Sequence, residues 1–99
     1  MNKYIIKIGN NPKEYTLNHL RAFNVKYLAA TNFKSSRVLI NDLRHKKRVI
    51  QSYNYEIGDI KNQAFKFLND LNIKVNSFYY NEKDNSYTLL TENFETMIK

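Results

Sequence analysis

The chain of 99 residues contains no cysteine and no tryptophan, and it has only two glycines and one proline. Without cysteine, disulfides and thiol chemistry are excluded, and so are zinc sites built on cysteine. With Gly9 and Gly58 as its only glycines, the chain carries neither a phosphate-binding loop nor a dinucleotide-binding fingerprint. The absence of cysteine also argues against a small secreted domain held together by disulfides.

Long apolar runs are absent as well. No stretch approaches the ~20 apolar residues that a membrane-spanning helix needs. Lys3 and Lys7 interrupt the N-terminal residues in which a signal peptide would have its apolar core. We therefore expect a cytoplasmic protein with no membrane partner.

What the chain does contain is enough apolar material for one modest core. Its hydrophobic fraction is 42%, with eight tyrosines and six phenylalanines, and a quarter of its residues are charged. This composition is typical of a globular protein rather than a disordered one. At this length we expect a single domain over residues 1–99.

Short-range patterns predict strands and helices along the chain. Residues 3–8 favour a strand by their β-branched and aromatic content, residues 9–12 a turn, and residues 13–16 a short returning strand. Leu17, Leu20 and Leu28 fit a helix face, so we expect a helix over about residues 17–24 and an extended segment to residue 31.

Residues 35–53 allow two interpretations. As a helix, they place Leu39, Leu43 and Ile50 on one side and the arginines on the other. As a hairpin, residues 37–43 and 48–55 form strands, and residues 44–47 form an exposed basic tip. Both interpretations expose the basic residues, and the sequence leaves the choice open.

The C-terminal half gives a clearer pattern. Ile60, Ala64, Phe67 and Leu71 recur at helical spacing within a predicted helix over residues 56–71. Residues 73–80 and 86–91 predict a hairpin with a polar loop over 81–85, and residues 93–99 predict a last helical turn. The whole predicts an α+β domain, in which an antiparallel sheet of about four strands carries two to three helices on one face.

Positive charge is concentrated in the N-terminal part of the chain. Residues 1–55 contain eleven lysines and arginines against two acids, whereas residues 56–99 contain five against seven. Such a concentration of like charge costs stability, so a partner that uses it is expected. The candidate partner-binding residues are Lys34, Arg37, Arg44, His45, Lys46, Lys47 and Arg48.

These residues could neutralise several phosphates and release their counterions. Arginine also offers a planar fork to phosphate or carboxylate. The predicted partners are a nucleic acid, a nucleoprotein complex or an acidic protein surface. The competing interpretation is a charged face that only contacts solvent.

Aromatic residues flank the basic segment. Phe33 precedes it, and Tyr53 and Tyr55 follow it, so these three are possible stacking residues for bases. Phe78, Tyr79 and Tyr80 suggest a stacking platform on a strand, but alternation sends Tyr79 to the other side from its neighbours, and core packing is the competing interpretation.

Catalytic chemistry finds little support. His19 and His45 are the only histidines, and with a lysine such as Lys46 or Lys47 they would suit a small ribonuclease, although nothing in the spacing brings them together. The nine acids are scattered, so no metal site is expected, nor any cofactor. We therefore expect a protein that is not an enzyme.

The start of the chain resembles small early-region proteins of bacteriophages and mobile elements of low-GC Gram-positive bacteria. The resemblance covers about the first forty residues: KYIIKIGN at 3–10, KYL at 26–28 and TNFKSSRV at 31–38. It implies a non-catalytic binder in the cytoplasm of a bacterial host, which acts on a host nucleoprotein machine. The most specific implied function is inhibition of a CRISPR effector or another host-defence nuclease.

Two alternatives remain open beside this hypothesis. One is a regulator that binds DNA or RNA directly, and the other is the two-histidine ribonuclease. The oligomeric state is also open, because the roughly opposite charges of the two halves would allow copies to associate.

Overall fold

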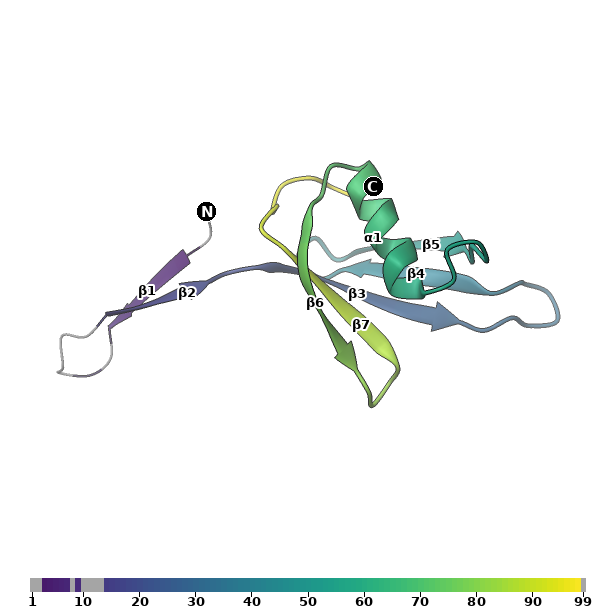
Figure 1. The fold of residues 1–99 in the computed structure, drawn as a ribbon, viewed down its shortest axis with the longest axis horizontal. Helices are drawn as coiled ribbons and strands as arrows, with labels where there is room; N and C mark the ends of the chain where they lie inside the picture. The colour runs from purple at the N-terminus through teal and green to yellow at the C-terminus, as the bar shows by residue number, and fades with distance from the viewer. Residues whose placement is uncertain (1–2, 8, 10–13, 99) are drawn as a thin grey trace.

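The centre of the protein is a five-stranded antiparallel sheet with the strand order β5-β4-β3-β7-β6 (Figure 1). A computed structural model describes residues 3–7, 9 and 14–98. Within these residues one α-helix, α1 (Ile60–Asp70), packs against the sheet. The strands of the sheet are β3 (Arg21–Leu28), β4 (Arg37–Asp42), β5 (Lys47–Ser52), β6 (Val75–Asn81) and β7 (Ser86–Thr91).

Alternation along the strands gives this sheet two different faces. Residues paired across neighbouring strands point to the same side, and the registers pair Phe23 with Leu89 and Val25 with Ile40. All four side chains are buried in the core against α1. The opposite side, which α1 does not cover, is called the helix-free face below.

The core lies between the sheet and α1, and the C-terminal tail helps to close it. Ile98 is buried in the core, although residues 92–98 contain no helix. Instead, the side chain of Asn93 accepts hydrogen bonds from the backbone N–H groups of Glu95 and Thr96, each at 3.1 Å. The fully buried apolar residues are Phe23, Val25, Val38, Ile40, Ala64, Leu68, Ile73, Leu89 and Ile98.

A second, two-stranded sheet projects from this body as an arm (Figure 1). It consists of β1 (Lys3–Lys7) and β2 (Glu14–Asn18), which pair antiparallel with each other and with no other described strand. The arm makes the molecule 61 Å long, and the Cα radius of gyration is 16.5 Å. A compact chain of this length would have a radius of gyration of about 13 Å.

The predicted α+β domain with two to three helices on a sheet of about four strands is wrong. The protein is mostly sheet, with one short helix among the described residues. Residues 17–24, predicted as a helix, belong to the end of β2 and the first half of β3. The predicted helical turn at 93–99 is also not formed in the described part, up to residue 98.

Other predicted elements agree with the structure or are shifted in their limits. The hairpin at 73–91 is confirmed as β6 and β7, and the N-terminal strands are confirmed where described. Five residues between them lie outside the described residues: Ile8, Asn10, Asn11, Pro12 and Lys13.

The central helix starts at Ile60 rather than at residue 56. Gly58 has φ of +84°, which is incompatible with a helix, and Asp59 caps the helix through a 2.8 Å hydrogen bond from the N–H of Lys61.

No helix in the described part of the chain is long and apolar enough to cross a membrane.

Candidate partner-binding site

The structure resolves residues 35–53 as a hairpin, formed by β4, a turn over residues 43–46, and β5. The hairpin interpretation is therefore confirmed and the helix is not formed. Five of the predicted site residues lie together at its turn. We call this group the basic tip: Arg44, His45, Lys46, Lys47 and Arg48.

Local chemistry explains why the turn forms here. The carboxylate oxygen Oδ1 of Asp42 accepts hydrogen bonds from the backbone N–H groups of Arg44, at 3.1 Å, and His45, at 3.3 Å. This is the usual way in which an aspartate stabilises a turn beginning at its own position. The N–H of Leu43 bonds the carbonyl of Ala22 at 3.2 Å, so the turn is also joined to β3.

A buried ion pair lies beneath the basic tip. Nη2 of Arg21 is 2.5 Å from Oδ2 of Asp42, and both side chains are completely buried. Nη1 of Arg21 also donates to the carbonyl of Asn93 at 3.1 Å. The pair therefore connects β3, the end of β4 and the C-terminal tail, three segments that are distant in the sequence.

His45 completes this network. Its Nδ1 lies 3.0 Å from Oδ2 of Asp42 and 3.1 Å from Nη2 of Arg21. A carboxylate only accepts hydrogen bonds and a guanidinium only donates them, so Nδ1 bonds one of the two at a time: with its hydrogen it donates to Asp42, and without its hydrogen it accepts from Arg21. His45 is therefore a structural partner of Asp42 in this conformation, and the tip's unpaired charge comes from its arginines and lysines.

The pKa of Asp42 is lowered. Burial by itself raises it, but the hydrogen bonds from the Arg21 and His45 side chains, the backbone N–H of His45 and the charge of Arg21 together outweigh burial. The unfolded chain therefore binds a proton at this carboxylate more readily than the folded chain does.

This shift predicts how stability depends on pH. The contribution of Asp42 to the free energy of unfolding is complete above the ordinary carboxyl pKa, near pH 4, and is lost as the pH falls through the lowered folded-state value. Thermal melts between about pH 7 and pH 2 would measure this. In Asp42→Asn, the free energy of unfolding should fall less steeply as the pH is lowered below about 4. An unchanged pH dependence in that variant would contradict the contribution assigned to Asp42.

The C-terminal tail also contacts the tip. The guanidinium of Arg44 lies over the ring of Phe94, with 4.7 Å from Cζ to the ring centroid, and the ring of His19 lies 5.0 Å from the same phenylalanine. A cation–π contact of this kind is worth about 0.5–1 kcal/mol at an exposed site. It holds Arg44 toward the tail; Arg44 is nevertheless exposed, as are Lys46, Lys47 and Arg48.

Lys34 and Arg37 lie at the other end of the hairpin. Lys34 is in the loop over residues 29–36, and Arg37 begins β4, whereas the tip follows its end. Six strand residues span about 20 Å. The structure therefore does not gather all seven predicted residues into one site.

Arg37 nevertheless lies on the same side of the sheet as Arg48 of the tip, namely the helix-free face. Arg37, Arg48 and Lys26 all point to this side, opposite Leu28, Asn41 and Leu39 respectively. No aspartate or glutamate occupies a position on this face in the described strands β3, β4 and β5. Lys26 forms an exposed ion pair with Asp84 at 3.7 Å, which is worth little.

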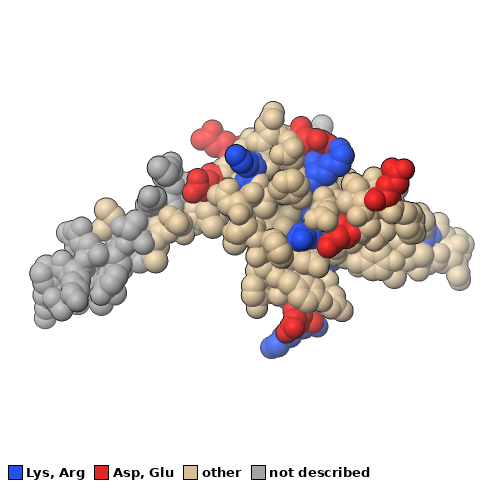
Figure 2. All heavy atoms as spheres, viewed as in Figure 1, with Lys and Arg blue, Asp and Glu red and all other residues tan. Residues whose placement is uncertain are grey.

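The charge of the tip is not compensated locally. Within the described ranges, no ion pair involves Arg44, Lys46, Lys47 or Arg48, and the nearest strand acid, Asp42, is committed to Arg21 and His45. The side of the molecule that carries α1 differs, because cations and acids are interspersed across it (Figure 2). The hairpin therefore carries a local surplus of positive charge, with five lysines and arginines against the single acid Asp42 in residues 37–52.

The predicted stacking residues lie away from the tip. Tyr53 and Tyr55 follow β5, and Phe33 is in the loop before β4, so all three are at the far end of the hairpin. Tyr53 is half-buried, with its ring 4.8 Å from that of Tyr55 and 5.7 Å from that of Tyr27, and its hydroxyl donates to the carbonyl of Gly58. Phe33 and Tyr55 are strongly exposed, at 94% and 77%.

The alternative stacking platform is divided as alternation predicts. Phe78 and Tyr80 point to the side of α1 and contact the ring of Tyr87, whereas Tyr79 points to the helix-free face. All three are at least partly exposed. None of them lies on the hairpin that carries the basic tip.

Two residues that sequence reasoning missed support the site. Arg21 neutralises Asp42, and Phe94 contacts both Arg44 and His19. One sequence signal pointed to the ion pair of Arg21 with Asp42. Asp42 is the only acid between residues 15 and 55, so a structural role for it could have been inferred. No sequence signal identifies Phe94.

The histidine hypothesis remains a prediction. His19, Arg21 and Arg44 line the same surface hollow, whereas His45, which contacts Arg21 and Asp42, is not among its lining residues. The described residues contain no group of three or more histidines, cysteines or acids that could hold a metal ion.

No protein-family model, curated protein sequence or solved structure matches the chain.

Proposed function

We propose that this protein is a non-catalytic binding protein whose basic tip engages a polyanionic partner, either a nucleic acid or a nucleoprotein complex of a bacterial host. One observation carries the proposal. Four cations follow one another around a single hairpin turn, with none paired to an acid among the described residues. Their mutual repulsion is relieved when phosphates or carboxylates approach.

The buried ion pair beneath the tip favours binding in a defined geometry rather than electrostatic attraction alone. The turn is fixed by Asp42, and Asp42 is fixed by Arg21, so the backbone at the tip is ordered before the partner arrives. A preordered site loses less entropy on binding. The end of a two-stranded hairpin is also narrow enough to enter the major groove of duplex DNA.

The resemblance to phage and mobile-element proteins supports a more specific version. In it, the tip blocks the nucleic-acid channel of a CRISPR effector or another host-defence nuclease. An inhibition assay would test it: the wild-type protein should suppress cleavage by the nuclease, and a variant with an uncharged tip should not. Full inhibition by that variant would contradict this version.

Salt dependence provides the test of direct nucleic-acid binding. If all four cations contact phosphates, the log–log plot of affinity against salt should have a slope of about −3.6, at about 0.9 per contact. Fluorescence anisotropy with a labelled DNA duplex and a labelled single-stranded RNA would measure the slope for each. A flat plot, or no binding to either probe at low salt, would remove nucleic acid as the partner.

An acidic protein surface would then be the partner to test. Capture of host proteins by the immobilised chain, with and without nuclease treatment of the lysate, separates the two cases. A partner retained after nuclease treatment and lost at high salt would identify a protein surface. A partner lost on nuclease treatment would identify bound nucleic acid.

A further inference from the structure

Four tyrosines and one aspartate line a single hollow beside the start of α1. Its volume is about 450 Å³. Tyr27 comes from the end of β3, Tyr87 from the start of β7, and Tyr53 and Tyr55 from the segment between β5 and α1. With Asp59, which precedes α1, these residues form what we call the tyrosine hollow.

The rings of the tyrosine hollow stand at an angle to one another. The Tyr53 ring lies 5.7 Å from that of Tyr27, with 86° between their planes, and 4.8 Å from that of Tyr55, with 55°. Two hydroxyls are held in place, because that of Tyr53 donates to the carbonyl of Gly58 and that of Tyr27 lies 2.7 Å from Oγ of Ser36. Since neither pair of rings is parallel, the three rings form no slot for a flat group and suit a rounded one.

The charge at this hollow is negative, although the chain as a whole has a formal net charge of +7. Asp59 is the only charged residue among the described residues that line it, and no ion pair within the described ranges involves it. Its full charge outweighs the roughly half positive charge of the N-terminus of α1. The pKa of Tyr87 is raised, first by burial and then by the negative charge of Asp59. The hollow therefore favours a cation.

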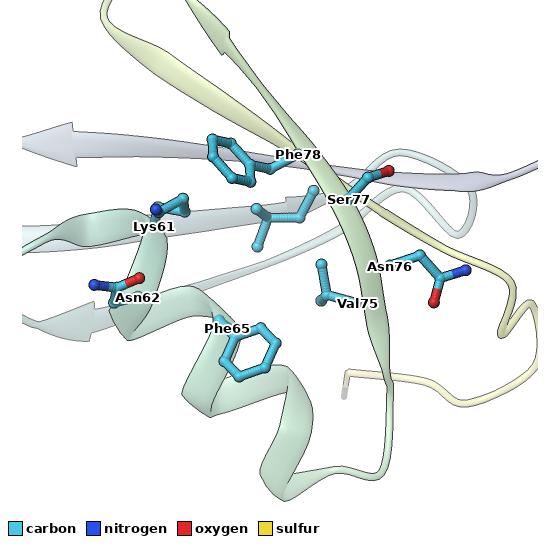
Figure 3. A pocket seen from close by; sticks show the side chains of 8 residues that line it. Lys61, Asn62, Phe65, Val75, Asn76, Ser77 and Phe78 are labelled. Carbon is cyan, nitrogen blue, oxygen red and sulfur yellow. The ribbon is translucent and has the colours of Figure 1, made fainter.

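A neighbouring hollow, between α1 and β6, already contains a cation on an aromatic ring. Nζ of Lys61 lies 4.4 Å from the centroid of the Phe78 ring there (Figure 3). The electron-rich face of an aromatic ring attracts a cation in this way. No lysine or arginine of the described chain lines the tyrosine hollow, so its cation would have to come from outside.

We propose that the tyrosine hollow binds an alkylated ammonium group, such as a trimethylammonium. The tyrosine rings and the carboxylate of Asp59 attract its charge, and rings set at an angle fit its rounded shape. The ammonium of a lysine is compact and strongly hydrated, so it costs more to remove from water. The guanidinium of an arginine is planar, so it fits rings at these angles less well.

This site does not rest on the proposed polyanion binding. Tyr53 and Tyr55 follow β5, at the opposite end of the hairpin from the basic tip. A failure of nucleic-acid binding would therefore leave this inference standing, and the reverse is also true.

Two probes of the same shape test whether the hollow recognises charge. Choline carries a trimethylammonium group, and 3,3-dimethylbutanol has a neutral carbon in place of the nitrogen. Titration of the ¹⁵N-labelled protein, followed by NMR, should show saturable shifts around Tyr55 and Asp59 with choline. The neutral probe should bind at least about tenfold more weakly. Equal binding of the two probes, or no saturable shift with choline, would overturn the inference.

Variants of exposed residues test the assignment to this hollow. Asp59→Asn removes the charge but keeps a helix cap, because asparagine caps about as well as aspartate, and it should weaken choline binding by about tenfold. Tyr55 is 77% exposed, so Tyr55→Ala should weaken binding without unfolding the protein, whereas Tyr55→Phe should keep it. Circular dichroism checks that each variant is folded.

Asp70→Asn is the matched control, because it removes an exposed acid at the other end of α1 and should leave choline binding unchanged. Wild-type binding in both Asp59→Asn and Tyr55→Ala would overturn the inference. Adenosine that shifts the same residues where choline does not would assign the hollow to base stacking, and would overturn it too. A peptide with a trimethylated lysine separates the sources of the group. Tighter binding of the peptide than of choline would identify a methylated protein side chain, and equal binding a free small molecule.

Discussion

Replacing Lys46, Lys47 and Arg48 together with alanine is expected to lower the affinity for duplex DNA by as much as about 500-fold at about 0.1 M salt. The figure follows from counterion release if each of the three side chains contacts one phosphate. The log–log slope should become less steep by about one unit for each lost contact. Arg44 is left unchanged because it lies over Phe94, so its removal would also disturb packing.

A matched variant separates the position of the charge from its amount. Replacing Lys61, Lys66 and Lys83 with alanine also lowers the formal net charge from +7 to +4, but all three lie outside the hairpin. Long-range attraction at about 0.1 M salt is screened within about 10 Å, so this control should change the affinity only slightly.

Anisotropy titrations of the two variants at several salt concentrations give both the affinity and the slope. Equal losses in the two variants would show that net charge alone attracts the partner, and the basic tip would then have no special role. Unchanged binding in the tip variant would place the contact elsewhere on the protein.

Replacing Asp42 with alanine is expected to reduce the free energy of unfolding by about 3–5 kcal/mol, because the substitution leaves Arg21 buried without its counter-charge. It also removes the acceptor that holds the turn. For a domain of this size, the loss corresponds to a fall in Tm of at least about 12 °C. Urea unfolding and thermal melts near neutral pH would measure it.

Asp70→Ala is the matched control for this prediction. It breaks the exposed pair with Lys66, in which the two charged atoms are 2.8 Å apart, and exposed pairs of this helical spacing are worth only about 0.3–0.5 kcal/mol. Replacing both Arg21 and Asp42 with apolar residues of similar size should recover much of the loss. Similar destabilisation in the Asp42 and Asp70 variants would mean that burial of the first pair contributes little.

The C-terminal half could be predicted from sequence because its signals are local. Ile60, Ala64 and Leu68 keep helical spacing, and two strand-forming stretches flank five polar residues. Two predictions in this half were wrong: the start of α1, and the last helical turn at 93–99, which is not formed up to residue 98. The positive φ of Gly58 and the capping by Asp59 move the first residue of α1 four residues beyond the predicted start.

The N-terminal half was predicted less well because the buried ion pair of Arg21 and Asp42 interrupts the apolar alternation of its strands. In β3, Arg21, Phe23 and Val25 are buried in alternation, and in β4 so are Val38, Ile40 and Asp42. Arg21 and Asp42 are charged, so each strand shows a polar residue where alternation requires an apolar one. Their burial is possible only because they neutralise each other across 21 positions of sequence.

The sequence by itself determined that one segment carries the surplus positive charge, that the chain lacks cysteine chemistry and phosphate-loop chemistry, and where its central helix and last hairpin lie. These properties depend on composition and on neighbours a few residues away. Only the tertiary structure decided that the basic residues surround a hairpin turn, that Lys34 and Arg37 lie at its far end, and that four tyrosines line one hollow. The reason is that strand pairing and the burial of Arg21 with Asp42 join segments whose attraction no local pattern records.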